Sequence, residues 1–502
     1  MRLYGWFALV SCTACALVNP GNFGTIDTTW RLQVTRWMRL GEPEVKPSGG
    51  NAAYGRDGRL HAVYGMGQSI VMLPLDALVS AAVPHLAATL SAEKQEQVEE
   101  LLVAFLMQSV ITMFVLILAH QVLLSFSLAP FVSAAGSLSL LFGTTALVYA
   151  QTAEENQLLL ALALCALWAT QRWDRDGGWW PVLAGAACEF AILTRLPSVL
   201  ETALFAVLPW FSARSWKRFV IAYLPPVLAA LAIDRFYQWV RFGDMFSTYI
   251  GLFGKQARPA GAPASYPFSY PFWKGFAGTF LSVDKSVLLF DPLLVVLALV
   301  MIWRWRHLDR ALRVTLLSFV ALLLAYATLY ARYFDFGGDV AWGHRFLTLP
   351  VQPLALFAAP LLLTHGRSLP FAVRGVAWTL LTASVALQLA STAIAPNLEV
   401  MQRDLGDYHG VLWNRAINLR ELTEGDGTDS RFQTVPPEWS SLYYLPFQLR
   451  FRFQKIAPWG IGAWLALACG LPILVASTLR CAGSPPGGRI ADAVLDVQRG
   501  AP

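Results

Sequence analysis

Stretches of about 20 apolar residues recur along the whole chain, and they restrict its fold more than any other feature. The stretch 101–124, for example, contains no Asp, Glu, Lys or Arg. About 20 such residues in a helix span the hydrocarbon core of a bilayer. Of the 502 residues, 56% are hydrophobic and 14% are charged, whereas soluble domains carry about 25% charged residues. The sequence therefore predicts an all-α, polytopic membrane protein.

Twelve transmembrane helices are predicted from these stretches. They lie near residues 3–18, 101–124, 131–150, 157–170, 181–194, 196–211, 219–238, 286–303, 314–331, 347–364, 374–393 and 459–479. The stretch 66–90 is also apolar, but it carries Pro74, Asp76, Pro84 and His85. We interpret 66–90 as a re-entrant or interfacial helix.

The distribution of Lys and Arg favours this interpretation. With 66–90 on the outer side, both termini and the basic loops 172–175, 214–218, 304–313 and 367–374 lie in the cytoplasm, as the positive-inside rule requires. If 66–90 were a span, those basic loops would lie on the outer side of the membrane. The same orientation brings together, at the outer face, residues that are hundreds of positions apart. They are Asp27, Glu154, Glu155, Arg195, Lys285, His344 and Arg345.

The predicted organisation has four parts. Residues 1–393 form a transmembrane core that includes an outer loop at 19–100. Residues 394–458 form an outer loop or small cap, 459–479 the last span, and 480–502 a Gly/Pro-rich, disordered cytoplasmic tail.

The first apolar stretch also has the length of a signal peptide, with a weak cleavage-site match at 14–16. We favour a retained helix, because Asp27 would need that anchor. Five of the six cysteines lie in apolar stretches and the sixth just beyond one, so their spacing indicates neither a disulfide framework nor a zinc site.

Asp27 opens a segment with a helical pattern of apolar residues, namely Ile26, Trp30, Val34, Trp37 and Met38. Arg31, Arg36 and Arg39 fall mostly off this stripe, so the segment is predicted to lie on the membrane surface with these arginines near lipid headgroups. A carboxylate held there is well placed to act on a lipid-linked substrate. The alternative is an ordinary first-turn acid favoured by the helix dipole.

Two further candidates are charges at the edges of apolar stretches. Glu154 and Glu155 form a tight outer turn, where acids near lipid are costly unless they are paired or functional. Alternatively, both simply face water. Arg195 interrupts a long apolar run, and its planar guanidinium suits a phosphate group. Its alternative role is snorkelling to lipid headgroups.

The outer loop 336–346 supplies three more candidates. Trp342 offers a flat apolar face, and Arg345 stands at the mouth of the next helix, where it could contact phosphate. His344 is either an acid/base or an ordinary interfacial histidine. Lys285 occupies a similar place before its own span, and its alternative role is an ion pair with Asp284.

The order of these features resembles the C-type fold of integral-membrane glycosyltransferases. That group includes the protein O-mannosyltransferases, the lipid A aminoarabinose transferase and bacterial relatives of unknown substrate. The resemblance covers roughly residues 1–365. It rests on the segments TWRLQVTRWMRLGE following Asp27, YGRDGRLHAVYGMGQSIVMLPL containing Tyr64, YAQTAEENQ, AILTRLP, RFGDMFSTYIG, SVDKSVLLFDPLL and GGDVAWGHRF. This chain departs from the pattern at Gly65, Met66 and His344, where prolines are common, and it has no second acid beside Asp27.

This resemblance implies transfer of a sugar from a polyprenyl-phosphate donor to a lipid, glycan or protein acceptor, at the outer side of a bacterial inner membrane. Asp27 would be the general base of an inverting displacement, supported by Glu155 or Glu154. Donor phosphate binding is expected at Arg195, Arg345 and Lys285, and substrate binding at His344, Trp342 and Tyr64.

No P-loop or Rossmann glycine motif occurs in the sequence, as expected for an enzyme whose donor is a lipid. No metal ligand set is predicted, because Asp27 lacks a neighbouring acid. The sequence indicates no cofactor, and it leaves open whether the enzyme needs a divalent cation. The net charge of +6 is interpreted as topology, not as nucleic-acid binding.

Two other classes remain open. A flippase of lipid-linked sugars would use the same outer cavity without chemistry, and an inert protein could share the fold. Transporters usually place ionisable residues near the bilayer midplane and show repeated halves. Here the notable charges lie at outer helix ends and no repeat is apparent, which favours an enzyme. The sequence does not name the sugar, the acceptor or the lipid length.

Overall fold

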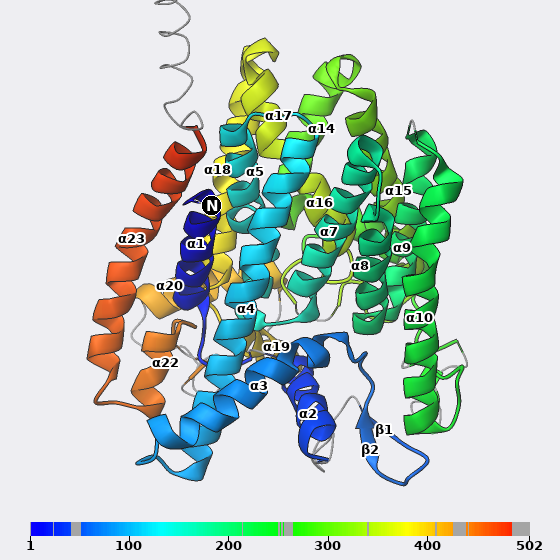
Figure 1. Ribbon diagram of the computed structural model, residues 1–502. Helices are drawn as coiled ribbons and strands as arrows, with labels where there is room; N and C mark the ends of the chain where they lie inside the picture. Colours follow the sequence, from blue (N-terminus) through cyan, green and yellow to red (C-terminus); the bar gives the residue numbers. More distant parts are fainter. Residues whose placement is uncertain are drawn as a thin grey trace, which may run out of the picture.

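Long helices form a bundle, and a layer of shorter elements covers one of its ends (Figure 1). The computed structural model describes residues 2–23, 25–41, 52–212, 214–248, 251–252, 255, 265–338, 341–406, 409–424, 438–439 and 441–483. Most of the predicted tail (484–502) and part of the predicted cap (425–437) lie outside the described residues.

The bundle contains most of the helical chain. Its helices are α1 (Arg2–Val18), α4 (Ala92–Ser125), α5 (Pro130–Phe142), α6 (Ala146–Thr152), α7 (Glu155–Asp176), α8 (Trp180–Thr194), α9 (Val199–Val207), α10 (Trp216–Phe242), α12 (Phe272–Leu281), α13 (Val287–Phe290), α14 (Leu293–Arg304), α15 (Arg310–Tyr330), α16 (Thr348–Ala355), α17 (Ala358–His365), α18 (Phe371–Ser391) and α23 (Ala457–Gly483). Short 3-10 turns extend some of them: η1 (Leu196–Ser198), η2 (Leu208–Phe211), η4 (Trp305–His307) and η5 (Gly366–Ser368).

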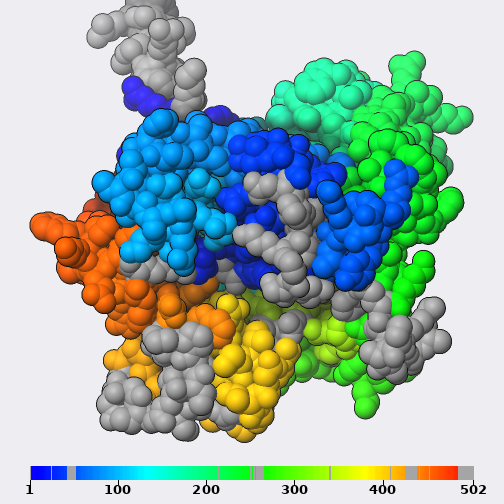
Figure 2. Space-filling view, turned by 90° about the horizontal axis from the view of Figure 1, so that it is seen from below, coloured from blue at the N-terminus to red at the C-terminus, as the bar shows by residue number. Residues whose placement is uncertain are grey.

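The lower layer in Figure 1 comes from the loops between these helices. It contains α2 (Ile26–Leu40), an antiparallel hairpin of β1 (Ala52–Tyr54) and β2 (Leu60–Ala62), α3 (Gly67–Leu86), α19 (Pro396–Asp404), α20 (Val411–Glu424) and α22 (Leu445–Arg452). Figure 2 views the molecule from this end. Segments near residue 400, in yellow, share the face with the blue N-terminal segments despite their distance in sequence.

The all-α polytopic prediction is confirmed. Within the described ranges, seven helices are long and apolar enough to cross a membrane, and the bent pair α5 and α6 would make an eighth. The segments 2–18, 180–194 and 196–211 are shorter apolar helices. Each of the twelve predicted spans coincides with a helix or a broken helix. Helix α3 passes the same length and composition test, and Figure 1 shows it running obliquely across the lower end, beside α2.

The break between α5 and α6 has a polar cause. Asp291 accepts hydrogen bonds from the backbone N–H of Thr145, at 2.7 Å, and from its hydroxyl, at 3.2 Å. Asp291 thus satisfies groups that a helix start leaves without intrahelical partners. The chain bends by 54° there. Asp291 is 146 residues from Thr145, so no local signal in the sequence indicates the break. The apolar pattern alone therefore predicted one continuous span at 131–150.

Helix α2 does not turn its arginines toward lipid, which corrects the sequence prediction. Arg36 is buried and pairs with Asp76 at 3.4 Å, Glu96 at 3.2 Å and Glu99 at 3.0 Å. Arg39 pairs with the other oxygen of Asp76 at 2.7 Å. These carboxylates belong to α3 and α4, so the basic face of α2 faces the protein.

A left-handed turn joins α6 to α7 and orients the two glutamates that follow it. Ala153 has φ +54°. Its carbonyl accepts hydrogen bonds from Gln68 of α3, at 2.7 Å, and Thr28 of α2, at 3.2 Å. The lower layer therefore fixes the backbone immediately before Glu154 and Glu155.

Candidate active site

Two adjoining cavities lie where the bundle meets the lower layer. The large cavity, about 640 Å³, is lined by residues that include Asp27, Tyr149, Glu154, Trp342, Arg345, Asp404, Arg415, Trp439 and Tyr443. The small cavity, about 70 Å³, is lined by residues that include Arg31, Tyr64, Glu155, Arg195, Asp234, Arg235, Arg345 and Phe346. Arg345 lines both cavities, so its guanidinium marks their junction.

Asp27 is a fully engaged carboxylate. One oxygen accepts a 2.6 Å hydrogen bond from the Tyr64 hydroxyl, and the other pairs with Arg345 at 2.7 Å. Burial would raise the pKa of Asp27, but the positive charges of Arg345 and Arg31 outweigh it and hold the pKa at about 2. A carboxylate with so low a proton affinity is a weak base at neutral pH.

Glu154 has the opposite environment. It is buried, and its Oε2 has no hydrogen-bond partner within the described structure. Burial raises the pKa of Glu154 to about 7, with Arg345 opposing the shift and the charges of Glu155 and Asp27 adding to it. A carboxyl that exchanges its proton near neutral pH suits general acid/base chemistry.

The small cavity gathers guanidinium groups. Arg31, only 3% exposed, pairs with Glu155 at 2.7 Å and lies 4.5 Å from the centre of the Tyr64 ring. Its Nε and Nη1 are buried and find no hydrogen-bond partner in the part of the chain that the structure describes. Four arginines line this cavity against two carboxylates, Glu155 and Asp234. The small cavity is therefore basic, and it suits an anionic group.

Arg195 reaches the small cavity because α8 ends there. Its backbone is extended, with φ −153° and ψ +114°, and this ends the helix. Its guanidinium donates to the Tyr330 hydroxyl at 3.4 Å and lies 4.9 Å from the centre of the Phe346 ring. Gly65 packs against this helix end so closely that an added Cβ would come within 2.4 Å of the Leu193 carbonyl.

The sequence led us to expect Asp27 and Arg195 in one water-accessible pocket, whereas the structure places them in two cavities. Asp27 lines the large cavity and Arg195 the small one. Arg345 connects them, because it pairs with Asp27 and lines both spaces. Asp27 and Arg195 thus belong to one site, and they lie on opposite sides of Arg345.

Two candidates from the sequence lie outside both cavities. Lys285 donates hydrogen bonds to the carbonyls of Ala341, at 2.7 Å, and Gly343, at 3.3 Å, and so holds the loop that carries Arg345. His344 is buried near the Thr279 hydroxyl, at 3.3 Å. Burial lowers the pKa of His344 to about 3, and the charge of Lys285 adds to this effect. These positions do not fit the predicted phosphate and substrate contacts.

Trp342 does line the large cavity, but one ring face is already covered. The Arg415 guanidinium carbon lies 4.4 Å from its ring centre, and its Nε1 donates to Gln388 at 3.0 Å. Phe290 packs edge-on at 4.7 Å. Trp342 therefore acts mainly as a support for the cavity wall.

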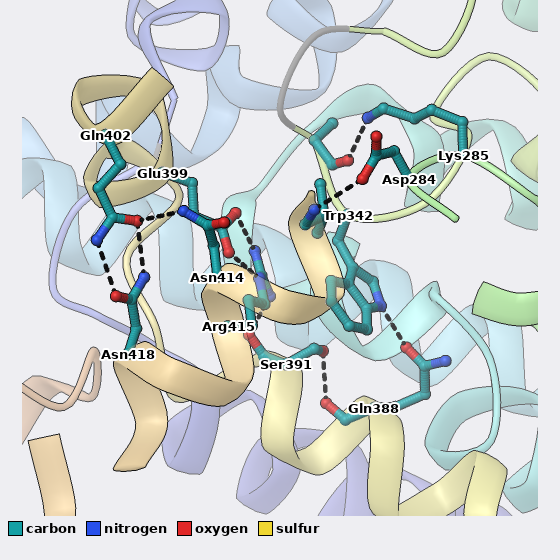
Figure 3. Close-up of polar contacts among 12 residues, drawn as sticks. Asp284, Lys285, Trp342, Gln388, Ser391, Glu399, Gln402, Asn414, Arg415 and Asn418 are labelled. Carbon is teal, nitrogen blue, oxygen red and sulfur yellow. Dashed lines mark hydrogen bonds and ion pairs between the residues drawn. The ribbon is translucent and has the colours of Figure 1, made fainter. Parts of the chain in front are cut away.

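A buried polar network behind this wall was missed in the sequence (Figure 3). Arg415 of α20 makes a two-point contact with Glu399 of α19, at 2.6 and 3.2 Å. Gln402 bonds Asn414 at 3.2 Å and Asn418 at 2.8 Å. Together these contacts lock α19 to α20 beside the large cavity. No spacing signal in 394–424 indicates that these residues meet.

A metal ion was left open by the sequence. Among the described residues, no group of three or more His, Cys, Asp or Glu side chains could hold a metal ion. The carboxylates Asp27, Glu154 and Glu155 are instead placed beside arginines. The described side chains at this site therefore supply no cation ligand set.

Fold and site together define a mainly helical, multi-pass membrane protein with a charged double cavity at one end of the bundle. Its structure is similar to the crystal structure of the Archaeoglobus fulgidus oligosaccharyltransferase in the apo form, with a TM-score of 0.45 and 12% identity. The match covers 87% of this chain but 60% of that one. No family model matches the sequence, and no curated protein matches it.

Proposed function

We propose that this protein is a membrane glycosyltransferase that moves a sugar from a polyprenyl-phosphate donor to an acceptor hydroxyl. The observation that carries the proposal is the pairing of two cavities with different chemistry. The small cavity is rich in arginine, and the large one carries Glu154, a carboxyl with a pKa of about 7. They meet at Arg345, where a sugar linked to phosphate on one side would face an acceptor on the other.

The donor phosphate would occupy the small cavity. Arg31, Arg195 and Arg345 line it, and buried N–H groups of Arg31 and Arg345 have no hydrogen-bond partner among the described residues. Guanidinium groups bind phosphate oxygens through charge-assisted hydrogen bonds. Such preorganised charge stabilises the leaving phosphate as the glycosidic bond breaks, and it is often the largest catalytic contribution.

The chemical step is a single displacement. The acceptor oxygen attacks the anomeric carbon, the bond from that carbon to the phosphate oxygen breaks, and polyprenyl phosphate leaves as an anion. The hydroxyl proton passes to Glu154. A positioned general base contributes about 10²–10⁴-fold. Attack from the face opposite the leaving group inverts the configuration of the anomeric carbon.

Asp27 takes a different role from the one that the sequence suggested. Its pKa of about 2 and its contacts with Arg345 and Tyr64 argue against service as the base. We propose that Asp27 instead positions Arg345 at the junction of the two cavities. Glu155 pairs with Arg31 and positions that guanidinium in the small cavity.

The site is proposed to face the non-cytoplasmic side of a bacterial inner membrane. Support comes from the basic loops, such as 214–218 and 304–313, which the positive-inside rule assigns to the cytoplasm. Helix α7 starts at Glu155 and ends at Asp176, near the basic Arg172 and Arg175. The glutamates therefore lie at the end opposite the basic residues.

A direct test is incubation of the purified protein in lipid nanodiscs with radiolabelled polyprenyl-phosphate sugars and a membrane extract as acceptor. Transfer of label is expected for the wild type, and loss of transfer for Glu154→Gln and Arg195→Ala. Arg172→Ala, at a partly exposed ion pair that lines neither cavity, is the matched control. If the labelled donor moved across the bilayer of proteoliposomes and no sugar were transferred, the protein would instead be a flippase.

A further inference from the structure

A separate cavity of about 380 Å³, called the distal cavity below, lies at the opposite end of α7 from the candidate active site. Helix α7 starts at Glu155, in the active site, and Asp174 in its last turn lines the distal cavity. The other walls come from the 3-10 turn η2 and the first turns of α15. The volume is within the usual range of small-molecule sites, and the proposed reaction does not use this space.

The wall formed by α15 suits an anion. This helix begins at Arg310, and no side chain caps its first turn, so the N–H groups there favour a negative charge. The Arg310 guanidinium is exposed and belongs to no ion pair among the described residues. Thr315 also lines the cavity and is 1% exposed, and its hydroxyl has no hydrogen-bond partner in the described part of the chain. Guanidinium and hydroxyl groups together can donate to phosphate oxygens.

The wall formed by α7 suits a cation. Asp174 accepts a hydrogen bond from the Ser212 hydroxyl. Arg214 donates to the backbone carbonyl of Asp174, at 2.9 Å, and not to its carboxylate. The ion pair of this helix end instead joins Arg172 to Asp176, at 2.9 Å. Within the described ranges, the Asp174 carboxylate is therefore left without a cationic partner.

The distal cavity thus presents one cation and one anion on opposite walls, and the two do not pair with each other. A ligand that carries both a phosphate and an ammonium group can pair with each wall at once, and such electrostatic complementarity gives specificity. A primary ammonium has three N–H donors for a carboxylate and a neighbouring acceptor. A trimethylammonium group has none.

The rim of the distal cavity is apolar and exposed. Trp210 is 64% exposed and Phe211 is 50% exposed, and both line the cavity. Val207, in the last turn of α9 just before η2, is 53% exposed and continues this surface. Tryptophan is enriched where membrane proteins cross the boundary between lipid and water. A ligand with a charged head and an apolar tail fits both the cavity and its rim.

From these observations we infer that the distal cavity binds the headgroup of phosphatidylethanolamine. Its phosphate would contact Arg310 and Thr315 on α15, its ammonium would contact Asp174 on α7, and its acyl chains would lie against Trp210 and Phe211. The inference does not depend on the proposed function, because no residue that lines the distal cavity lines either cavity of the candidate active site.

Native mass spectrometry of the purified, detergent-solubilised protein can measure this preference. The protein is titrated with phosphatidylethanolamine, phosphatidylcholine and phosphatidylglycerol that carry the same acyl chains. Phosphatidylethanolamine should bind about tenfold more tightly than the other two, because choline has no N–H donor and glycerol has no positive charge. Equal binding of the ethanolamine and choline lipids, or tighter binding of phosphatidylglycerol, would overturn the inference. Free phosphoethanolamine that binds as tightly as the lipid would also overturn it.

Substitutions on the two walls locate the lipid. Arg310→Ala and Thr315→Val should each weaken phosphatidylethanolamine binding about threefold or more. Asp174→Asn should remove the preference over phosphatidylglycerol. The matched control is Arg367→Ala, an exposed guanidinium of η5 that does not line the distal cavity.

Two results separate this inference from the proposed function. If Arg310→Ala and Asp174→Asn bound every lipid as the wild type does, the lipid would bind elsewhere and the inference would be wrong, whether or not the protein transfers sugar. If the wild type transferred no sugar but bound phosphatidylethanolamine with the expected preference, the proposed function alone would fail.

Discussion

At the scale of single residues, Glu154 decides the pH dependence of the reaction. A base must be deprotonated to accept a proton, and the pKa of Glu154 is raised to about 7 by burial. We therefore expect kcat/KM to rise about tenfold per pH unit below 7 and to level off above it. Glu154→Gln should remove this dependence and lower kcat/KM by about 10²–10⁴-fold. A flat profile for the wild type between pH 5 and 8 would speak against Glu154.

Asp27 should affect the same profile through its charge. The negative charge of Asp27 raises the pKa of Glu154, while Arg345 lowers it. Asp27→Asn removes the first effect and frees Arg345 for Glu154, so the midpoint of the pH–rate profile should move below 7. An unchanged midpoint would contradict this effect of Asp27 on Glu154. Complete loss of transfer at every pH with donor binding intact would return the role of base to Asp27.

Asp27 also contributes to stability in a defined pH range. Its pKa is held at about 2, below the ordinary 3.8, so the folded state favours its ionised form. This stabilisation is fully present above 3.8 and is lost as the pH falls toward 2. The sequence could not predict the different proton affinities of Asp27 and Glu154. They depend on Arg345, which is 318 residues from Asp27.

At the scale of elements, the attachment of α2 depends on a buried ion network. Asp76 is fully buried and pairs with Arg36 and Arg39. Asp76→Ala leaves both arginines short of a partner and should cost about 3–5 kcal/mol, seen as a lower Tm in detergent. The control, Asp176→Ala, removes the exposed partner of half-buried Arg172 and should cost about 0–1 kcal/mol. Equal Tm values for the two variants would refute this account of α2.

The sequence predicted where helices occur better than it predicted which side of each helix faces the protein. Spans were found because an apolar run of about 20 residues is a local signal. The helical stripe of α2 showed which residues share a face, but not that Arg31 and Arg36 face inward. Their partners, Glu155 and Asp76, are distant in sequence. One local signal was available: Arg31 follows Asp27 by four residues, on the same helix face.

For the molecule as a whole, the proposed function requires that both cavities open on the outer side of the membrane. In a cysteine-free background, Tyr54→Cys on the β1 strand, 72% exposed, should react with a membrane-impermeant maleimide in intact cells. Trp179→Cys, 60% exposed beyond the far end of α7, should react only after permeabilisation. The reverse pattern would place the site in the cytoplasm.

The most direct test of the double cavity is a structure of the protein with an intact polyprenyl-phosphate sugar. We expect the phosphate within hydrogen-bond distance of Arg195 and Arg345, with the anomeric carbon of the sugar facing Glu154. A phosphate bound elsewhere, or a sugar held away from Glu154, would contradict it.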